Sequence, residues 1–205
     1  MTTHLKLVQP TTEKRTVNKG RRPNRELRTR EYLTAKEVDR LIEAAKANRQ
    51  GDRDATMILI AYRHGLRASE LVDLRWEQVD LDHALLHVRR VKNGTPATHP
   101  LTGKEMRALR KLQRENDASP FVFTSERGAP FSVSGFRRLI ERATQAAGLE
   151  IKAHPHMLRH ACGYALANRS TDTRTLQAYL GHRNIANTVR YAELAPNRFR
   201  GLWKD

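Results

Sequence analysis

The chain has 205 residues, the size of one ordinary domain, and it contains no apolar run long enough to cross a bilayer. Its 38 Lys and Arg residues outnumber its 22 Asp and Glu residues, which gives a formal net charge of +16. This charge predicts binding to a polyanion, with nucleic acid as the leading candidate. Aromatic residues make up only 6% of the chain, which argues against a base-stacking platform for single strands and favours duplex DNA held through its phosphates.

Residues Met1 to Glu31 carry many more lysines and arginines than glutamates and show little hydrophobic periodicity. This composition predicts a mobile basic arm, followed by one domain from Tyr32 to Asp205. Charge alone does not distinguish an arm that follows the DNA backbone from a tail of no special role.

Cys162 is the only cysteine of the chain and lies at an apolar position of a predicted helix. We expect it to belong to the core, because nothing near it in sequence forms the Cys/His pairing of a reactive thiol. A lone cysteine indicates a reducing compartment, and the amino terminus has no apolar signal core. We therefore expect a bacterial cytoplasmic protein that is associated with the nucleoid and not with a membrane.

Capping boxes, apolar periodicity and closing glycines predict the helices before residue 150. The signals are Thr34 with Glu37, an apolar run from Asp54 to Arg63, Thr102 with Glu105, and Ser132 or Ser134 with Gly148. The run from Asp54 to Arg63 is apolar nearly all round, which predicts a helix at the centre of the core.

Short alternating runs follow Trp76, at residues 78–81 and 84–88, and a partner strand is expected at 97–101. Asn93-Gly94 between the last two runs is a strong hairpin signal. A brief apolar strand is also expected from Pro120 to Thr124. The predicted fold class is therefore mainly α with a small antiparallel β-sheet.

A further helix is predicted to begin at Pro155. Proline fixes φ near the helical value, and its missing backbone N–H is not needed in the first turn, where N–H groups have no partner within the helix. His156, Arg159 and His160 then lie in or just after its first turn. Free backbone N–H groups and the positive end of the helix dipole lie at the same place. Together these groups predict a pocket for an anion such as a phosphate.

The last predicted elements are a helix from Thr173 to Leu180, which Gly181 ends with a left-handed cap, and a short helical run that carries Tyr191. His182 follows the cap directly. A phenol is a poor nucleophile at neutral pH, but cations that bind a phosphodiester also stabilise the charge that builds as a tyrosine attacks it. Residues 153–191 are therefore the candidate catalytic stretch.

From about Thr34 onward the chain resembles the tyrosine recombinases, the phage-integrase family. The matching residues are Gly65-Leu66-Arg67-Ala68-Ser69-Glu70-Leu71, Lys92 beside the hairpin turn, His156-Met157-Leu158-Arg159-His160, Leu180-Gly181-His182, and Tyr191 nine residues later. The chain looks most similar to the short members that invert the promoter segment for type 1 fimbriae.

This resemblance implies a site-specific DNA recombinase that needs neither a metal nor a nucleotide cofactor. Tyr191 is then expected to attack the scissile phosphate and form a 3′-phosphotyrosyl link. Arg67, Arg159 and His182 are expected to bind the non-bridging oxygens, and Lys92 is expected to protonate the leaving 5′ oxygen. His156 is expected to help to move the tyrosine proton. Glu70 and His160 are expected to have supporting roles.

The partners implied by the resemblance are duplex DNA with specific recombination sites, further copies of the chain in a tetramer, and DNA-bending accessory proteins. The tail after Tyr191 is expected to dock on a neighbouring subunit through Phe199 and Trp203. The basic residues expected to touch DNA are Arg89, Arg90, Arg137, Arg138 and Arg142.

Alternatives stay open for parts of this interpretation. Glu70 either orients Arg67 or forms an ordinary surface ion pair with it. His154, His156 and His160 suggest a metal site, although the glutamate expected between such ligands is absent. A non-catalytic DNA-binding or accessory protein that keeps the fold is also possible, since charge predicts binding and not cleavage.

Overall fold

The computed structural model describes residues 30–91, 94–115 and 119–193. Most of the predicted basic arm, Lys92, and the expected tail anchors Phe199 and Trp203 lie outside these residues. The fold described below is that of the unit that begins at Tyr32.

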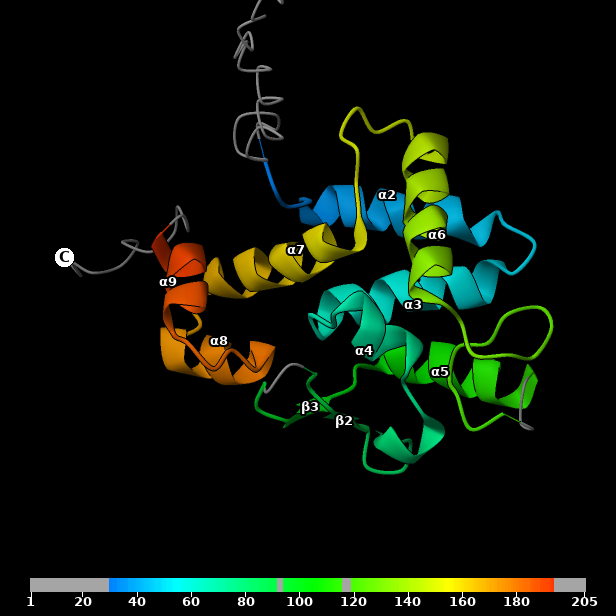
Figure 1. Cartoon of the computed structure of the whole chain (residues 1–205), viewed down its shortest axis with the longest axis horizontal. Coiled ribbons are helices and arrows are strands. Elements are labelled where there is room, and N and C mark those ends of the chain that lie inside the picture. The colour runs from blue at the N-terminus through cyan, green and yellow to red at the C-terminus, as the bar shows by residue number, and fades with distance from the viewer. Residues whose placement is uncertain (1–29, 92–93, 116–118, 194–205) are drawn as a thin grey trace, which may run out of the picture. The chain divides into compact units, whose positions relative to one another are not determined.

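The described chain is mostly helical, with a small sheet between helices α4 and α5 in the chain order (Figure 1). The helices are α2 Ala35–Lys46, α3 Gly51–Arg63, α4 Ala68–Val72, α5 Gly103–Glu115, α6 Val133–Ala146, α7 Pro155–Ala167, α8 Thr173–Leu180 and α9 Ala186–Glu193, with a short 3₁₀ helix at Trp76–Gln78. No helix in the described residues is long and apolar enough to span a membrane.

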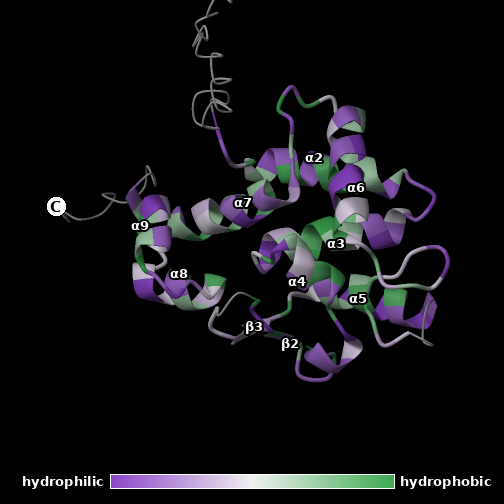
Figure 2. Ribbon diagram, viewed as in Figure 1, coloured by the Kyte–Doolittle hydropathy of each residue, from purple (hydrophilic) through white to green (hydrophobic). Residues whose placement is uncertain are grey.

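Helix α3 lies at the centre of the core, where it packs against α2, α5 and α7. Much of its ribbon is green, the colour of hydrophobic residues, whereas the ribbons of the surrounding helices carry many purple, hydrophilic residues (Figure 2). Met57, Ile58 and Ile60 are completely buried. The helix begins at Gly51, earlier than the predicted Asp54, because acidic residues in its first turn favour the positive end of the helix dipole.

Side-chain caps set the starts of three other helices, as predicted. Thr34 and Glu37 form a capping box at α2, and the Thr102 backbone N–H donates to Glu105 Oε2 at 2.7 Å before α5. At α6 the Ser132 hydroxyl accepts from the Gly135 backbone N–H at 3.0 Å, so Ser132 and not Ser134 is the cap.

The sheet is antiparallel, with strands in the order β1 Val79–Asp80, β2 Leu85–Val88 and β3 Ala97–Pro100. The β2 and β3 pairing matches Leu86 with His99 and Val88 with Ala97, which confirms the predicted hairpin. The strand predicted at Pro120 to Thr124 was wrong. This segment forms only isolated bridges, because its backbone partners are single residues of two different segments and not a neighbouring strand.

Helices α7, α8 and α9 form one end of the domain and contact one another (Figure 1). Gly181 ends α8 with φ +63°, which confirms the predicted left-handed cap. A Cβ atom at this position would lie 2.7 Å from the Thr95 carbonyl oxygen, so glycine also allows the turn to approach the hairpin. The fold class is confirmed as mainly α with a small antiparallel sheet.

Candidate active site

Arg159 is the most buried cation of the candidate site, with 2% of its surface exposed. Its Nη1 donates to the carbonyl of Gly65, at the turn after α3, and its Nη2 donates to the Leu180 carbonyl at 2.7 Å. Burial, followed by the charges of Arg90 and Arg67, lowers the pKa of Arg159 to about 10, so the side chain stays cationic at neutral pH. One guanidinium therefore joins α7 to the end of α8 and to the segment that precedes Arg67.

Arg67 lies at the N-cap of α4, and its side chain is 26% exposed. Its Nη1 donates to Glu70 Oε1 at 2.6 Å, and its backbone N–H donates to Glu70 Oε2 at 2.9 Å. Burial would raise the pKa of Glu70, but hydrogen bonds from Arg67 and the charge of Arg90 lower it overall. Because the Glu70 carboxylate is buried, this is not an ordinary surface pair, and Glu70 orients the guanidinium of Arg67.

His182 directly follows the Gly181 turn, and its Nδ1 lies 2.9 Å from the Thr188 hydroxyl of α9. Burial and the nearby charges of Arg159 and Arg67 lower the pKa of His182 to about 4. Burial, followed by the charge of Arg159, lowers the pKa of His156 to about 4. Arg159 bonds to the carbonyl two residues before Arg67 and to the carbonyl two residues before His182, so these predicted residues come together around one region.

Tyr191 lies on α9 with its ring 2% exposed. Its hydroxyl is 2.8 Å from Nδ1 of His160, and its ring is nearly parallel to the His182 ring at a centroid distance of 6.3 Å. A Cβ atom at Gly163 would lie within 2.8 Å of the tyrosine ring, so only glycine fits there. Burial raises the pKa of Tyr191 to about 12, which keeps the phenol protonated in this arrangement.

Arg190 is a part of the site that sequence reasoning missed. Its Nη2 lies 3.1 Å from each ring nitrogen of His160, and its Cζ lies 5.5 Å from the Tyr191 ring centroid. Burial, followed by His156 and Arg190, lowers the pKa of His160 to about 3. The only sequence signal for Arg190 was its position next to Tyr191, which does not reveal that it reaches back to α7.

The described residues contain no group of three or more His, Cys, Asp or Glu side chains arranged to hold a metal ion. His156 and His160 instead pack edge to face at a centroid distance of 4.3 Å. Cys162 of the same helix is buried, with its Sγ 3.4 Å from the Arg63 carbonyl, and burial raises the pKa of its thiol to about 12. This arrangement disfavours the metal-site interpretation and places the cysteine in the core.

Comparison with known proteins agrees with this geometry. Residues 31–198 match the model of the phage integrase family. The chain is 45% identical to the type 1 fimbriae regulatory protein FimE of Escherichia coli K12 over 181 residues, which cover 85% of this chain and 91% of FimE. The chain belongs to the phage integrase family. It is a tyrosine recombinase, the class of enzymes that break and rejoin DNA strands at specific sites.

Solved recombinases share the fold. XerA recombinase superposes with a TM-score of 0.72 at 28% identity, and the match covers 82% of this chain but only 62% of XerA. The XerH site-specific recombinase, solved in a post-cleavage complex with its palindromic difH substrate, superposes with a TM-score of 0.71 at 19% identity, over 82% of this chain and 51% of XerH.

The recombinase structure corrects one predicted DNA contact. The side chain of Arg90 is 0% exposed and pairs with Glu70 Oε2 at 3.0 Å, so it cannot reach a DNA backbone. Its neighbour Arg89 is 69% exposed and pairs with Glu77 at 3.0 Å. The alternation of the strand could have predicted that Arg90 is buried and Arg89 exposed, because Leu86 and Val88 face the core and position 90 continues on the same side.

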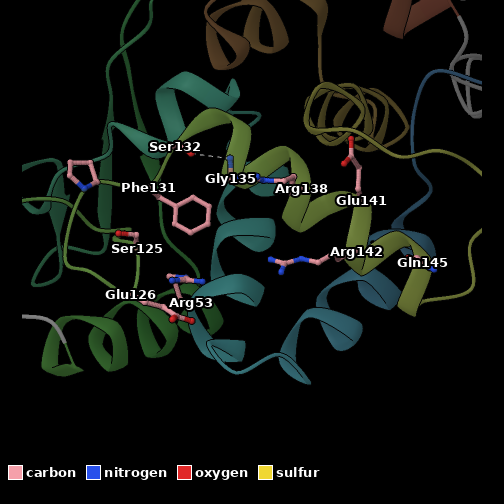
Figure 3. Close-up of a pocket in the computed structure, with 11 residues that line it drawn as sticks. Arg53, Ser125, Glu126, Phe131, Ser132, Gly135, Arg138, Glu141, Arg142 and Gln145 are labelled. Atoms are coloured by element: carbon pink, nitrogen blue, oxygen red, sulfur yellow. Dashed lines mark hydrogen bonds between the residues drawn. The ribbon is translucent and has the colours of Figure 1, made fainter.

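The three arginines predicted on α6 are exposed. Arg137 pairs with Glu141 at 3.5 Å, whereas Arg138 and Arg142 show no ion pair among the described residues. These two line an open pocket of about 680 Å³ beside Phe131 and Arg53. Figure 3 shows Arg142 of α6 and Arg53 of α3 pointing toward this hollow.

We expect the stability of this domain to fall as the pH drops from 7 to 4. The pKa values of His99 and His160 are lowered to about 3, mainly by burial, and those of His156 and His182 to about 4. Because histidine in the unfolded chain titrates near 6.5, the unfolded state binds more protons in this window. The two buried rings with the lowest pKa values, His99 and His160, should together lower the free energy of unfolding by about 2–3 kcal/mol per pH unit.

Urea unfolding at pH 7.5 and pH 5.0 measures this effect, and the free energy of unfolding should be clearly smaller at pH 5.0. Repeating both titrations at high salt provides the control, because salt screens repulsion between exposed charges but not the cost of charging a buried ring. Equal stability at the two pH values would contradict the prediction.

Proposed function

We propose that this recombinase cleaves double-stranded DNA at specific sites through a covalent 3′-phosphotyrosyl link to Tyr191, and rejoins the strands by the reverse step. The observation that supports it most is the gathering of Arg67, Arg159 and His182 around one region that also holds the Tyr191 ring. Preorganised cations of this kind stabilise the negative charge that develops on a phosphate under attack.

In the proposed step, the Tyr191 oxygen loses its proton and forms a bond to phosphorus, while the bond from phosphorus to the 5′ oxygen breaks. The 5′ oxygen takes a proton from a general acid, a role that the family resemblance gives to Lys92. Arg67, Arg159 and His182 bind the non-bridging oxygens. The 5′ hydroxyl of the same or another strand can then reverse the step, because the phosphotyrosyl bond conserves the energy of the broken bond.

The family resemblance implies that His156 helps to move the tyrosine proton, but we propose His160 for this step because of its contact with the tyrosine hydroxyl. Its Nδ1 lies 2.8 Å from the Tyr191 hydroxyl, which is within the reach required of a general base. Its low pKa of about 3 leaves the ring neutral, and the tautomer without a proton on Nδ1 can accept the phenolic proton. His156 packs edge to face against His160 and supports that ring.

Replacing His160 with asparagine is expected to slow single-turnover cleavage by about 10²- to 10⁴-fold, the usual contribution of a general base. His156→Asn is the matched control one turn away and should slow cleavage much less. The rates are measured with ordinary DNA and with DNA whose leaving 5′ oxygen is replaced by sulfur. Sulfur leaves without a proton, so it should not rescue His160→Asn; rescue by sulfur, or a rate equal to wild type, contradicts the assignment.

The family membership also supports proposals about DNA binding. Arg138 and Arg142 are exposed and form no ion pair with another described residue. Together with Arg137 on the same helix and Arg89 on the hairpin, they are suited to contact DNA phosphates. We propose that the basic residues of 1–31 follow the DNA backbone, and that four copies assemble on DNA through the tail with Phe199 and Trp203. DNA-bending accessory proteins would assist this assembly at the nucleoid.

The likeness to FimE over 91% of that protein's length supports a regulatory role. We propose that this recombinase inverts a DNA segment that carries a promoter, and so switches a downstream gene on or off. Sequencing the DNA that becomes covalently attached to the protein in cells identifies the segment, and two inverted copies of one short site should flank it.

Incubation with negatively supercoiled plasmid that carries such a site, in EDTA, tests the proposed chemistry. A recombinase should relax the plasmid and leave a fraction of the DNA covalently bound to protein after denaturation. A non-catalytic accessory protein would only retard the DNA on a gel. That second result would overturn the proposed function.

A further inference from the structure

We propose that Arg90 is a positioning residue that sets the placement of Arg67 and His182 relative to each other. This inference rests on the proposed cleavage function. Arg90 follows β2, and its guanidinium is enclosed at the point where α4, the turn after α3 and the end of α8 meet. It does not touch solvent, so its effect on the reaction has to pass through its neighbours.

Toward Arg67, the link passes through Glu70. Arg90 Nη1 donates to Glu70 Oε2 at 3.0 Å, while Arg67 Nη1 donates to Glu70 Oε1 at 2.6 Å. The Val91 backbone N–H also donates to Glu70 Oε1, at 3.2 Å. The carboxylate is therefore held on one side by Arg90 and presents its other oxygen to Arg67.

Toward His182, the link passes through the end of α8. Arg90 Nη2 donates to the Tyr179 carbonyl at 2.6 Å, in the last turn before Gly181. A Cβ atom at Gly181 would lie 2.7 Å from Cγ of Arg90, so the left-handed turn rests directly on the arginine stem. His182 leaves that turn, and its position depends on where the stem lies.

The contacts of Arg90 require an arginine. Nη1 and Nη2 reach Glu70 and the Tyr179 carbonyl, with longer bonds of 3.4 and 3.3 Å to the carbonyls of Gly65 and His64. A lysine carries its charge on a single atom and cannot span acceptors on separate elements. Gly94 packs on the same stem, since a Cβ atom there would lie 2.8 Å from Cβ of Arg90, so the hairpin shares this support.

The experiment measures single-turnover cleavage of a suicide DNA substrate at saturating DNA, together with DNA affinity and thermal stability. Arg90→Met should cleave about 10- to 100-fold more slowly, the loss expected when catalytic groups are misplaced by about 1 Å. The DNA Kd should stay within about threefold of wild type, because the side chain is buried. Arg90→Lys should cleave at an intermediate rate.

Two comparisons separate positioning from general loss of stability. Leu41→Ala removes a fully buried side chain of α2, and it should lower Tm while leaving the cleavage rate of the folded protein nearly unchanged. In the Arg67→Ala background, Arg90→Met should reduce the cleavage rate by a clearly smaller factor than in wild type, because part of its effect passes through Arg67.

The inference is overturned if folded Arg90→Met cleaves at the wild-type rate. It is also overturned if Arg90→Met slows cleavage by the same factor in the Arg67→Ala background as in wild type. If Arg90→Met does not fold, Arg90→Lys replaces it, alone and in the Arg67→Ala background, and the same two outcomes overturn the inference. Failure of the wild-type protein to form a covalent complex would overturn both this inference and the proposed function. Covalent capture by wild type with unaffected Arg90 variants would overturn the inference alone.

Discussion

Replacing Tyr191 with phenylalanine is expected to abolish covalent capture of DNA while leaving DNA binding almost intact. The change removes the oxygen atom that bonds to phosphorus in the proposed step. The ring still fills the space beside Gly163, so the loss of stability should be limited to the hydrogen bond to His160, about 1–3 kcal/mol.

The measurement is capture on a suicide substrate, read as a protein band of raised mass after denaturation, with gel-shift binding measured in parallel. Tyr62→Phe is the matched control, because Tyr62 is a partly buried tyrosine on α3 whose hydroxyl has no role in the proposed reaction. It should capture DNA as wild type does. A covalent band from Tyr191→Phe would show that another residue is the nucleophile.

Replacing Arg159 with alanine should have large effects on both cleavage and stability, because this side chain is expected to serve both the reaction and the fold. Loss of one charged donor to the reacting phosphate should slow cleavage by about 10²- to 10³-fold. The same change leaves the Leu180 carbonyl without its partner and opens a cavity in the core, at a cost of about 2–4 kcal/mol.

Arg159→Lys separates these two contributions, since it keeps the charge but cannot bond to both the Gly65 and the Leu180 carbonyls. We expect it to recover part of the stability and little of the cleavage rate. Arg40→Ala is the control for loss of an arginine bond to a backbone carbonyl, because the exposed Arg40 of α2 donates to the Ala147 carbonyl at the end of α6. Equal rates for Arg159→Lys and wild type would contradict the role given to the guanidinium.

Most helices could be predicted because their signals are local. A capping box such as Thr34 with Glu37, or a glycine such as Gly181 at positive φ, acts through neighbours a few residues away. The strand expected at Pro120 to Thr124 failed for the opposite reason. A strand exists only when a partner lies beside it, and apolar composition does not say whether one does.

Most members of the candidate site could be expected from the family pattern, but Arg190 and the contacts between the members could not. The sequence places Tyr191 and His160 on separate helices and says nothing of the bond between them. Arg89 and Arg90 look alike in sequence, yet one is exposed and the other is completely buried. Burial of a charge is decided by long-range packing, and only the alternation along β2 hinted at it.

Gly163 has a mechanical consequence for the nucleophile. The backbone of α7 lies against one edge of the Tyr191 ring, the Tyr164 ring meets it edge to face at 5.0 Å, and the His182 ring lies parallel to it. Because these neighbours enclose the ring, we expect a large change in its side-chain torsions to require a movement of α9. In the proposed cleavage step, the hydroxyl would then approach a DNA phosphate through a shift of this helix. The moment of strand cleavage would in that case depend on the position of a whole helix and not on the rotation of one side chain.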